Sequence, residues 1–147
     1  MDKVTSLKMY LLTFIGSTGS LILNLLGGWD MALQTLMILM ALDYVTGLIV
    51  AGVFNNSNKT KTGALESKAG WKGLCRKGMT LVIVLVGAQL DKMTGTDLIR
   101  NAVIIGYAAN EAISITENAG LMGLPIPNVI KKAIDILKQK ADEKEGE

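Results

Sequence analysis

The chain has 147 residues, of which 50% are hydrophobic and only 5% aromatic, and its formal net charge is +2. Glycine (16 residues) and methionine (8 residues) are plentiful, which is typical of membrane-embedded helices rather than of a soluble core. The absence of histidine excludes His-based metal sites, histidine general bases and Ser-His-Asp triads. The single cysteine excludes an intramolecular disulfide.

The first apolar block covers residues 10–26 and follows a short segment that carries Lys3 and Lys8. A charged start before an apolar run is also the pattern of a secretory signal peptide. The apolar run is long, however, and no Ala-x-Ala-like cleavage site follows it. We therefore expect an uncleaved first membrane span, with a cleaved signal as the alternative.

The second block, residues 31–53, contains one charged residue, Asp43, close to its middle. A spanning helix needs roughly 20 residues, so this block is long enough to cross a membrane. A carboxylate near the bilayer centre costs roughly 2.5–3.5 kcal/mol on insertion scales. Asp43 is therefore a candidate functional residue.

A polar, basic stretch follows, and residues 54–78 hold six Lys or Arg residues against Glu66 alone. By the positive-inside rule, the predicted loop 54–73 is cytoplasmic. We expect this region to bind anionic lipid rather than nucleic acid, with an aromatic side chain as interfacial anchor. The predicted lipid-facing residues are Lys68, Trp71, Lys72, Arg76 and Lys77.

The third and fourth spans are predicted over residues 74–90 and 98–117. The third block is short, and it crosses only if Arg76 and Lys77 reach back to the interface. A buried or re-entrant third segment is the alternative, which would leave three spans. Four spans place both termini in the cytoplasm, in a multi-pass protein of the bacterial cytoplasmic membrane.

The fourth predicted span carries a polar stripe on an otherwise apolar helix. Counting along the spans places Asn110 and Glu111 at about the depth of Asp43, so these groups can hydrogen-bond one another if the helices touch. Ser114 and Glu117 continue the Asn110 face. The stripe is either a fixed hydrogen-bond network or a surface that lines water once subunits assemble.

Residues 1–125 are thus expected to form an all-α transmembrane domain, and residues 126–147 an amphipathic helix with a charged tail. The apolar residues after Asn128 fall on one helical face, opposite the lysines. This pattern suits a helix on the inner leaflet, or equally a helix packed on the protein's own loops.

Three motifs precede the amphipathic helix: "LDYVTG" (42–47), "ESKAGWKGLCRK" (66–77) and "NEAISITENAGLMGLPIP" (110–127). Together with that helix, they resemble the phage lysis and toxin-secretion holin family of Gram-positive bacteria and their phages. The similarity covers roughly residues 30–140. The segment "FNNSNKTKTG" before Glu66 departs from the family pattern, either as a longer loop or as a regulatory contact.

The resemblance implies a homo-oligomer that accumulates in the membrane and opens lesions through which an endolysin, or in some bacteria a toxin, escapes. It implies no enzymatic activity, cofactor or metal. The endolysin is then a functional partner, and an antiholin is a further possible partner. The expected intramembrane polar contacts, for assembly or pore lining, involve Asp43, Tyr44, Thr46, Gly47, Tyr107, Asn110, Glu111, Ser114, Glu117 and Asn118.

Two other functions fit the same sequence. An antiholin would have the same topology without lethality. A small channel or transporter subunit built around Asp43 would give selective flux without release of a cytosolic enzyme.

Overall fold

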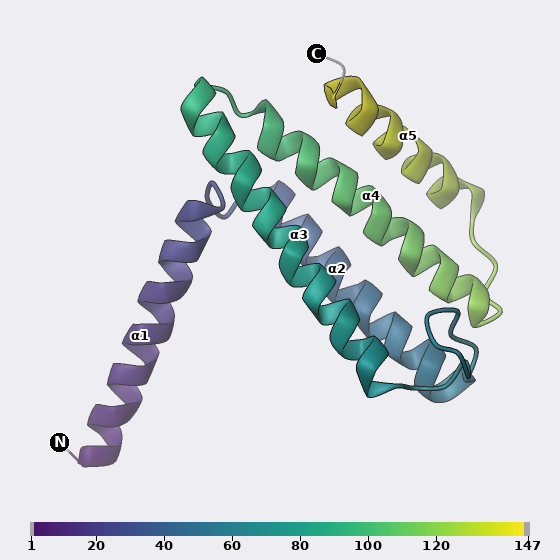
Figure 1. The fold of residues 1–147 in the computed structure, drawn as a ribbon, viewed down its shortest axis with the longest axis horizontal. Coiled ribbons are helices and arrows are strands. Elements are labelled where there is room, and N and C mark those ends of the chain that lie inside the picture. Colours follow the sequence, from purple (N-terminus) through teal and green to yellow (C-terminus); the bar gives the residue numbers. More distant parts are fainter. Residues whose placement is uncertain (1, 146–147) are drawn as a thin grey trace.

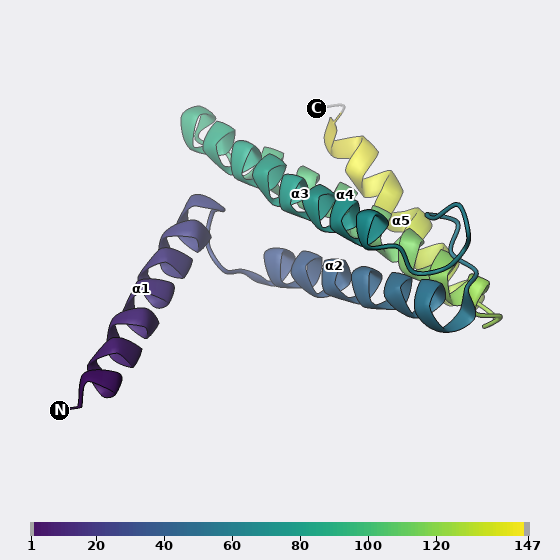
Figure 2. The ribbon, with the colours of Figure 1, turned by 60° about the horizontal axis from the view of Figure 1, so that its bottom comes forward.

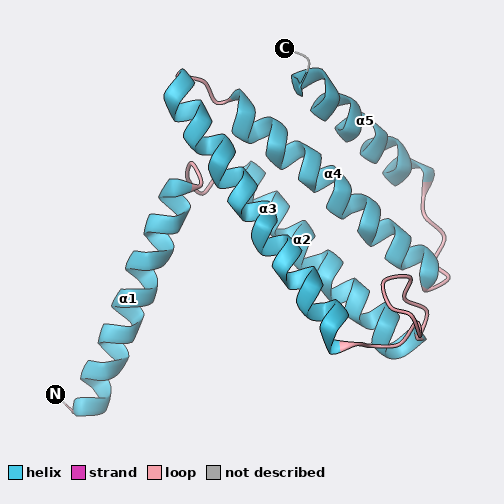
Figure 3. Cartoon of the chain, viewed as in Figure 1, coloured by secondary structure: helices cyan, strands magenta, loops and turns pink. Residues whose placement is uncertain are grey.

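The computed structural model describes residues 2–145, with side chains through Lys140, and it is all-helical over that range. The helices are α1 (Lys3–Leu25), α2 (Met31–Ile49), α3 (Ser67–Thr94), α4 (Leu98–Leu121) and α5 (Asn128–Glu145). A π-helical turn, η1 (Val50–Phe54), extends α2. Figure 3 shows that the longer connections are the loop before α3 and the segment between α4 and α5. The predicted all-α fold is confirmed.

Helices α2, α3 and α4 form a bundle, whereas α1 projects away from it (Figures 1 and 2). No residue of α1 is buried. The core of the bundle is made by apolar side chains from α2, α3 and α4, together with Leu26, the residue that directly follows α1. The fully or nearly buried members are Leu33, Leu36, Met40, Val84, Ile104 and Ala108.

Among the described residues, three helices are long and apolar enough to cross a membrane: α1, α2 with η1, and α3. Helix α4 forms as predicted but is not one of these three, since Arg100, Glu111 and several amides lower its hydropathy. It nevertheless packs against both α2 and α3, and Figure 1 shows it running alongside α3. Its place in the bundle therefore does not follow from hydropathy alone.

The start of the third predicted helix differs from the structure. Helix α3 begins at Ser67 rather than at residue 74, so Lys68, Trp71 and Lys72 are helical instead of lying in the predicted loop 54–73. The 28 residues of α3 are long enough to span without help from flanking cations.

Helix α5 packs along α4, with Ile134 buried, rather than on loops.

The approach of α3 to α4 depends on Gly87. A methyl group added at Gly87 would lie 3.1 Å from the Cα atom of Arg100, so a larger residue there must push the two backbones apart. Gly78, on the same helix, has no atom within 4 Å of such a methyl group. The two glycines therefore form a matched pair for testing this contact.

We predict that Gly87→Ala is less stable than Gly78→Ala by roughly 1–3 kcal/mol, the usual cost of overpacking. Both substitutions gain the same helix propensity, so the difference isolates the α3–α4 contact. Thermal unfolding of the two variants in detergent micelles measures it. Equal stabilities would show that the two backbones are not in contact at Gly87.

Candidate functional site

An ion cluster connects the three helices of the bundle. The Lys77 ammonium, on α3, donates to Asp43 Oδ2 on α2 at 2.8 Å and also to Glu111 Oε2 on α4. The three side chains are between 10% and 13% exposed. Because the ammonium is shared between two carboxylates on different helices, the cluster fixes the relative positions of all three helices.

Asn118 adds a second connection between α2 and α4. Its side-chain amide donates to Thr46 Oγ1 at 2.9 Å and to Asp43 Oδ1 at 3.3 Å. Asn118 is almost completely buried. A methyl group at Gly47 would lie 3.8 Å from the Asn118 nitrogen, which is an ordinary van der Waals distance, so Gly47 borders the amide without being needed to make room for it.

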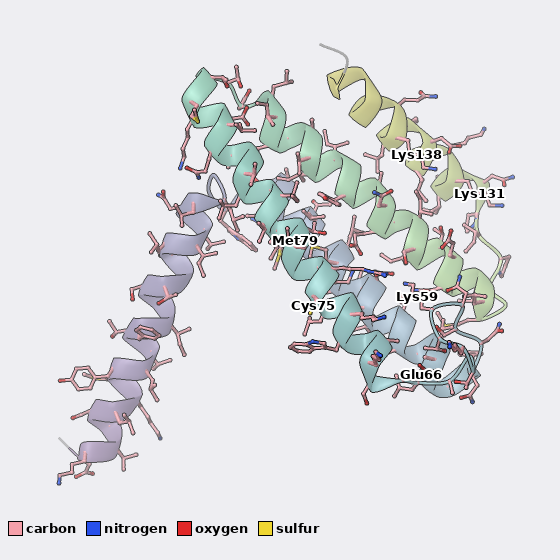
Figure 4. The ribbon with its side chains drawn as sticks, in the orientation of Figure 1. Lys59, Glu66, Cys75, Met79, Lys131 and Lys138 are labelled. Atoms are coloured by element: carbon pink, nitrogen blue, oxygen red, sulfur yellow. The ribbon has the colours of Figure 1, made fainter. Side chains whose placement is uncertain are left out.

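The fourth charged member comes from the loop between η1 and α3. Lys59, which is labelled in Figure 4, has its Nζ atom 3.7 Å from Asp43 Oδ1 and donates to Ser114 Oγ at 3.0 Å. The Lys59 side chain is 49% exposed, far more than its partners. The cluster thus contains two carboxylates and two ammonium groups and is neutral as a whole.

The remaining predicted contact residues are arranged around this cluster. Tyr44 lies against two glycines of α3, Gly70 and Gly73, and Tyr107 is half-buried beside the apolar core. Asn110 is exposed and lines a cavity next to the cluster. Glu117 is exposed and forms no hydrogen bond or ion pair among the described residues. It therefore does not continue the polar network as the stripe predicted.

The interpretation of Lys77 as a lipid-facing loop residue is wrong. Lys77 is the eleventh residue of α3, about 15 Å along the helix from its start, and its ammonium is held inside the bundle. The other four members of that predicted set, Lys68, Trp71, Lys72 and Arg76, are exposed on α3. Their contact with lipid remains a prediction.

A cavity of about 340 Å³ opens beside the ion cluster. It is lined by residues of α2, α3, α4 and the intervening loop, and the cluster residues form one wall. Leu48, Ala51 and Leu65 contribute apolar surface, and Arg76 and Lys72 contribute positive charge. A site for a metal ion is not indicated, since no cluster of three or more candidate ligands occurs among the described residues.

A second polar cluster surrounds Arg100, at the start of α4. Its residues were not predicted from the sequence. The Arg100 guanidinium donates to Asp30 Oδ2 at 2.7 Å and to the backbone carbonyl oxygens of Leu26 and Gly28. Gly27 has a φ of +88°, and a methyl group there would lie 2.7 Å from Arg100 Nε. The turn between α1 and α2 is therefore folded around this guanidinium.

Asp91, on α3, completes this end of the bundle. Its carboxylate accepts from the backbone N–H groups of Ile99 and Arg100, at 3.0 and 2.8 Å, and from the Thr96 hydroxyl. Asp91 thus satisfies N–H groups at the start of α4 that have no partner within the helix. Arg100 and Asp91 together attach the start of α4 to α3 and to the first turn.

The sequence that carries the two clusters matches a known family. The model of the bacteriophage holin family matches residues 20–139, which include every residue of both clusters. The chain belongs to this holin family. It is therefore a multi-pass protein of the cytoplasmic membrane rather than an enzyme.

Relatives of the chain occur in bacteria and in a phage. The chain is 41% identical over 120 residues to an uncharacterized protein of Halalkalibacterium halodurans, covering 78% of this chain and 83% of the relative. It is 38% identical over 128 residues to an uncharacterized 14.9 kDa protein in the nagH 3' region of Clostridium perfringens, covering 86% and 91%. A probable holin of Bacillus phage phi105 is 30% identical over 113 residues, covering 76% and 78%. No solved structure matches the chain significantly.

We predict that Lys77→Met destabilises the holin by roughly 3–5 kcal/mol, because it leaves two buried carboxylates without their shared cation. Lys72→Met is the matched control, since Lys72 is exposed on the same helix and forms no ion pair among the described residues. Thermal unfolding in detergent measures both variants. If the two variants lose equal stability, the ammonium of Lys77 does not hold the bundle together.

The Arg100 cluster predicts a pH dependence. Hydrogen bonds from Arg100 hold the pKa of Asp30 below its ordinary value of 3.8. Folding therefore gains stability from ionised Asp30 above pH 3.8, and this gain is lost as the pH falls through the lower folded-state pKa. Asparagine also caps helices well, so Asp30→Asn removes the charge and keeps the cap on α2.

The stability difference between wild type and Asp30→Asn is expected to be constant near neutral pH and to shrink below pH 3.8. Unfolding curves in detergent across this pH range test it. Asp97→Asn, at an exposed site whose side chain caps no helix, is the control and should show a smaller change. A pH-independent difference for Asp30→Asn would contradict the ion pair.

Proposed function

We propose that this chain is a holin proper, which assembles with copies of itself in the cytoplasmic membrane and opens lesions that release an endolysin or a toxin. The observation that carries the proposal is the neutral cluster of four charged side chains between apolar helices. Charges at that depth are tolerated only when they are paired or face water. The same groups are therefore stable in two situations, a closed bundle and a water-lined assembly.

The proposal includes four spans with both termini in the cytoplasm. Helices α2 and α3 are apolar enough to span, and Glu111 on α4 lies at the level of Asp43 and Lys77. At one end of α2, Arg100 of α4 donates a hydrogen bond to Asp30. At the other end, Asn56, just beyond η1, donates to the carbonyl oxygen of Leu121, the last residue of α4. Helix α4 therefore runs past the whole length of α2, which supports a fourth crossing.

Helix α1, which packs little on its own chain, offers a surface through which subunits can assemble. Apart from Leu23, which packs against the core, its large apolar side chains are exposed and available to lipid or to another subunit. Within the four-span arrangement, a helix that packs loosely on its own chain can change neighbours at little cost, because lipid and protein solvate an apolar surface about equally well. Oligomer growth through α1 would leave the closed bundle of α2, α3 and α4 intact until the ion cluster opens.

Co-expression with an endolysin that lacks its own export signal tests the function. We expect delayed, sudden lysis that requires both proteins. An antiholin would instead leave growth unaffected when expressed alone. A transporter subunit would give selective ion flux without loss of the endolysin from the cytosol.

In the same assay, Asp43→Asn and Glu111→Gln are expected to shift lysis to an earlier time, because the first removes two ion pairs from the closed bundle and the second removes one. Glu117→Gln makes the same chemical change at an exposed position of α4 and should lyse on the wild-type schedule. Unchanged timing and extent of lysis in both cluster variants would falsify the role of the cluster in holding the closed state.

A further inference from the structure

The loop between η1 and α3, residues 55–66, folds back onto the bundle instead of extending into solvent. Asn55 adopts a left-handed conformation (φ +48°) that ends the π-helical turn, and the loop closes on itself through Ser57 N–H to the Gly63 carbonyl at 2.9 Å. Asn56 donates to the last residue of α4, Leu121, at 3.1 Å. Lys59 then reaches Ser114, two helical turns before that end.

Lys59 determines the charge balance of the ion cluster. The helices alone contribute Asp43, Glu111 and Lys77, which sum to one net negative charge inside an apolar bundle. Lys59 raises this sum to zero, and it is the only charged member that comes from outside the helices. An uncompensated buried charge is strongly destabilising, so the cluster needs either Lys59 or a cation in its place.

Lys59 is also the member that can leave most easily. Its side chain is 49% exposed, and its nitrogen is 3.7 Å from Asp43, compared with 2.8 Å for Lys77. An exposed, long ion pair contributes little to stability by itself. The loop carries no helix or strand between Asn55 and Glu66, so its departure breaks few backbone hydrogen bonds.

The loop covers the cavity beside the cluster. Lys59, Thr60 and Leu65 of the loop line this space of about 340 Å³ together with Asp43 and Glu111. The hydroxyl oxygen of Thr60 is buried and has no partner among the described residues. The space has apolar walls as well as the charged groups of the cluster, and its volume is enough for a small cation with some of its water once the loop has moved away.

We propose that Lys59 is a removable counter-ion: it closes the cavity and neutralises the cluster, and when the loop leaves, a small monovalent cation from solution takes its place between Asp43 and Ser114. The loop thereby regulates access to the intramembrane charges. This inference concerns the closed chain in isolation and does not depend on the pore proposed above, so either can fail without the other.

Cysteine labelling tests the closing of the cavity. Ala51 is buried and lines the cavity, so Ala51→Cys in a Cys75→Ser background reports on access to it. In lipid nanodiscs, we expect Lys59→Met to raise the rate of labelling by a polar maleimide roughly tenfold, within the usual range of coupling between sites. Lys61→Met, the same change at an exposed neighbour in the loop, should leave the labelling rate unchanged. Lys59→Arg keeps the positive charge and should be labelled at nearly the rate of the protein with Lys59.

A second experiment tests whether a small cation from solution replaces the Lys59 ammonium. The melting temperature of Lys59→Met should rise more with sodium or potassium chloride than with the chloride of a bulky organic cation at equal ionic strength. Wild type, Lys61→Met and the neutral double variant Lys59→Met/Asp43→Asn should show no such preference. Equal labelling of Lys59→Met and Lys61→Met, or no preference for small cations in Lys59→Met, would overturn the proposal.

Discussion

The structure depends on one ammonium group shared by two carboxylates. Lys77 is bonded to Asp43 and Glu111, and each of these three residues belongs to a different helix. In a bilayer the hydrophobic effect does not drive helices together, because lipid tails are as apolar as the side chains that they replace. Association must then come from close packing and from polar contacts, and here the ion cluster supplies a polar contact that all three helices need.

The central helix is α4, because both polar clusters attach to it. Glu111 and Asn118 bind it to α2 and α3 on one side of its midpoint, and Arg100 binds its start to the first turn and to Asp91. A helix of this composition would insert poorly by itself, since its charges need partners that only the other helices provide. The folding of α4 into the bundle and the neutralisation of its charges are therefore the same event. This coupling makes the packing of the bundle depend on a few polar atoms.

Part of this arrangement could be predicted from the sequence. Counting residues along two apolar blocks placed Asp43 level with Glu111, and the two residues do belong to one cluster. Lys77 was misassigned because a lysine beside Arg76 at the edge of an apolar block ordinarily reaches to the interface. Its helical spacing relative to the buried Thr80, Val84 and Asp91 was the available signal. Lys59 could not have been placed, because its contact depends on how an irregular loop folds back over 55 residues of sequence separation.

The most direct measurement of the central claim is the distance from the Lys77 nitrogen to the two carboxyl carbons in lipid bilayers. Solid-state NMR with ¹⁵N-lysine and ¹³C-carboxyl labelling gives this distance, and the difference spectrum against Lys77→Met assigns it. The account predicts strong ¹⁵N–¹³C dipolar coupling from Lys77 to both an aspartate and a glutamate carboxyl group. A Lys77 nitrogen without dipolar coupling to either group would contradict it.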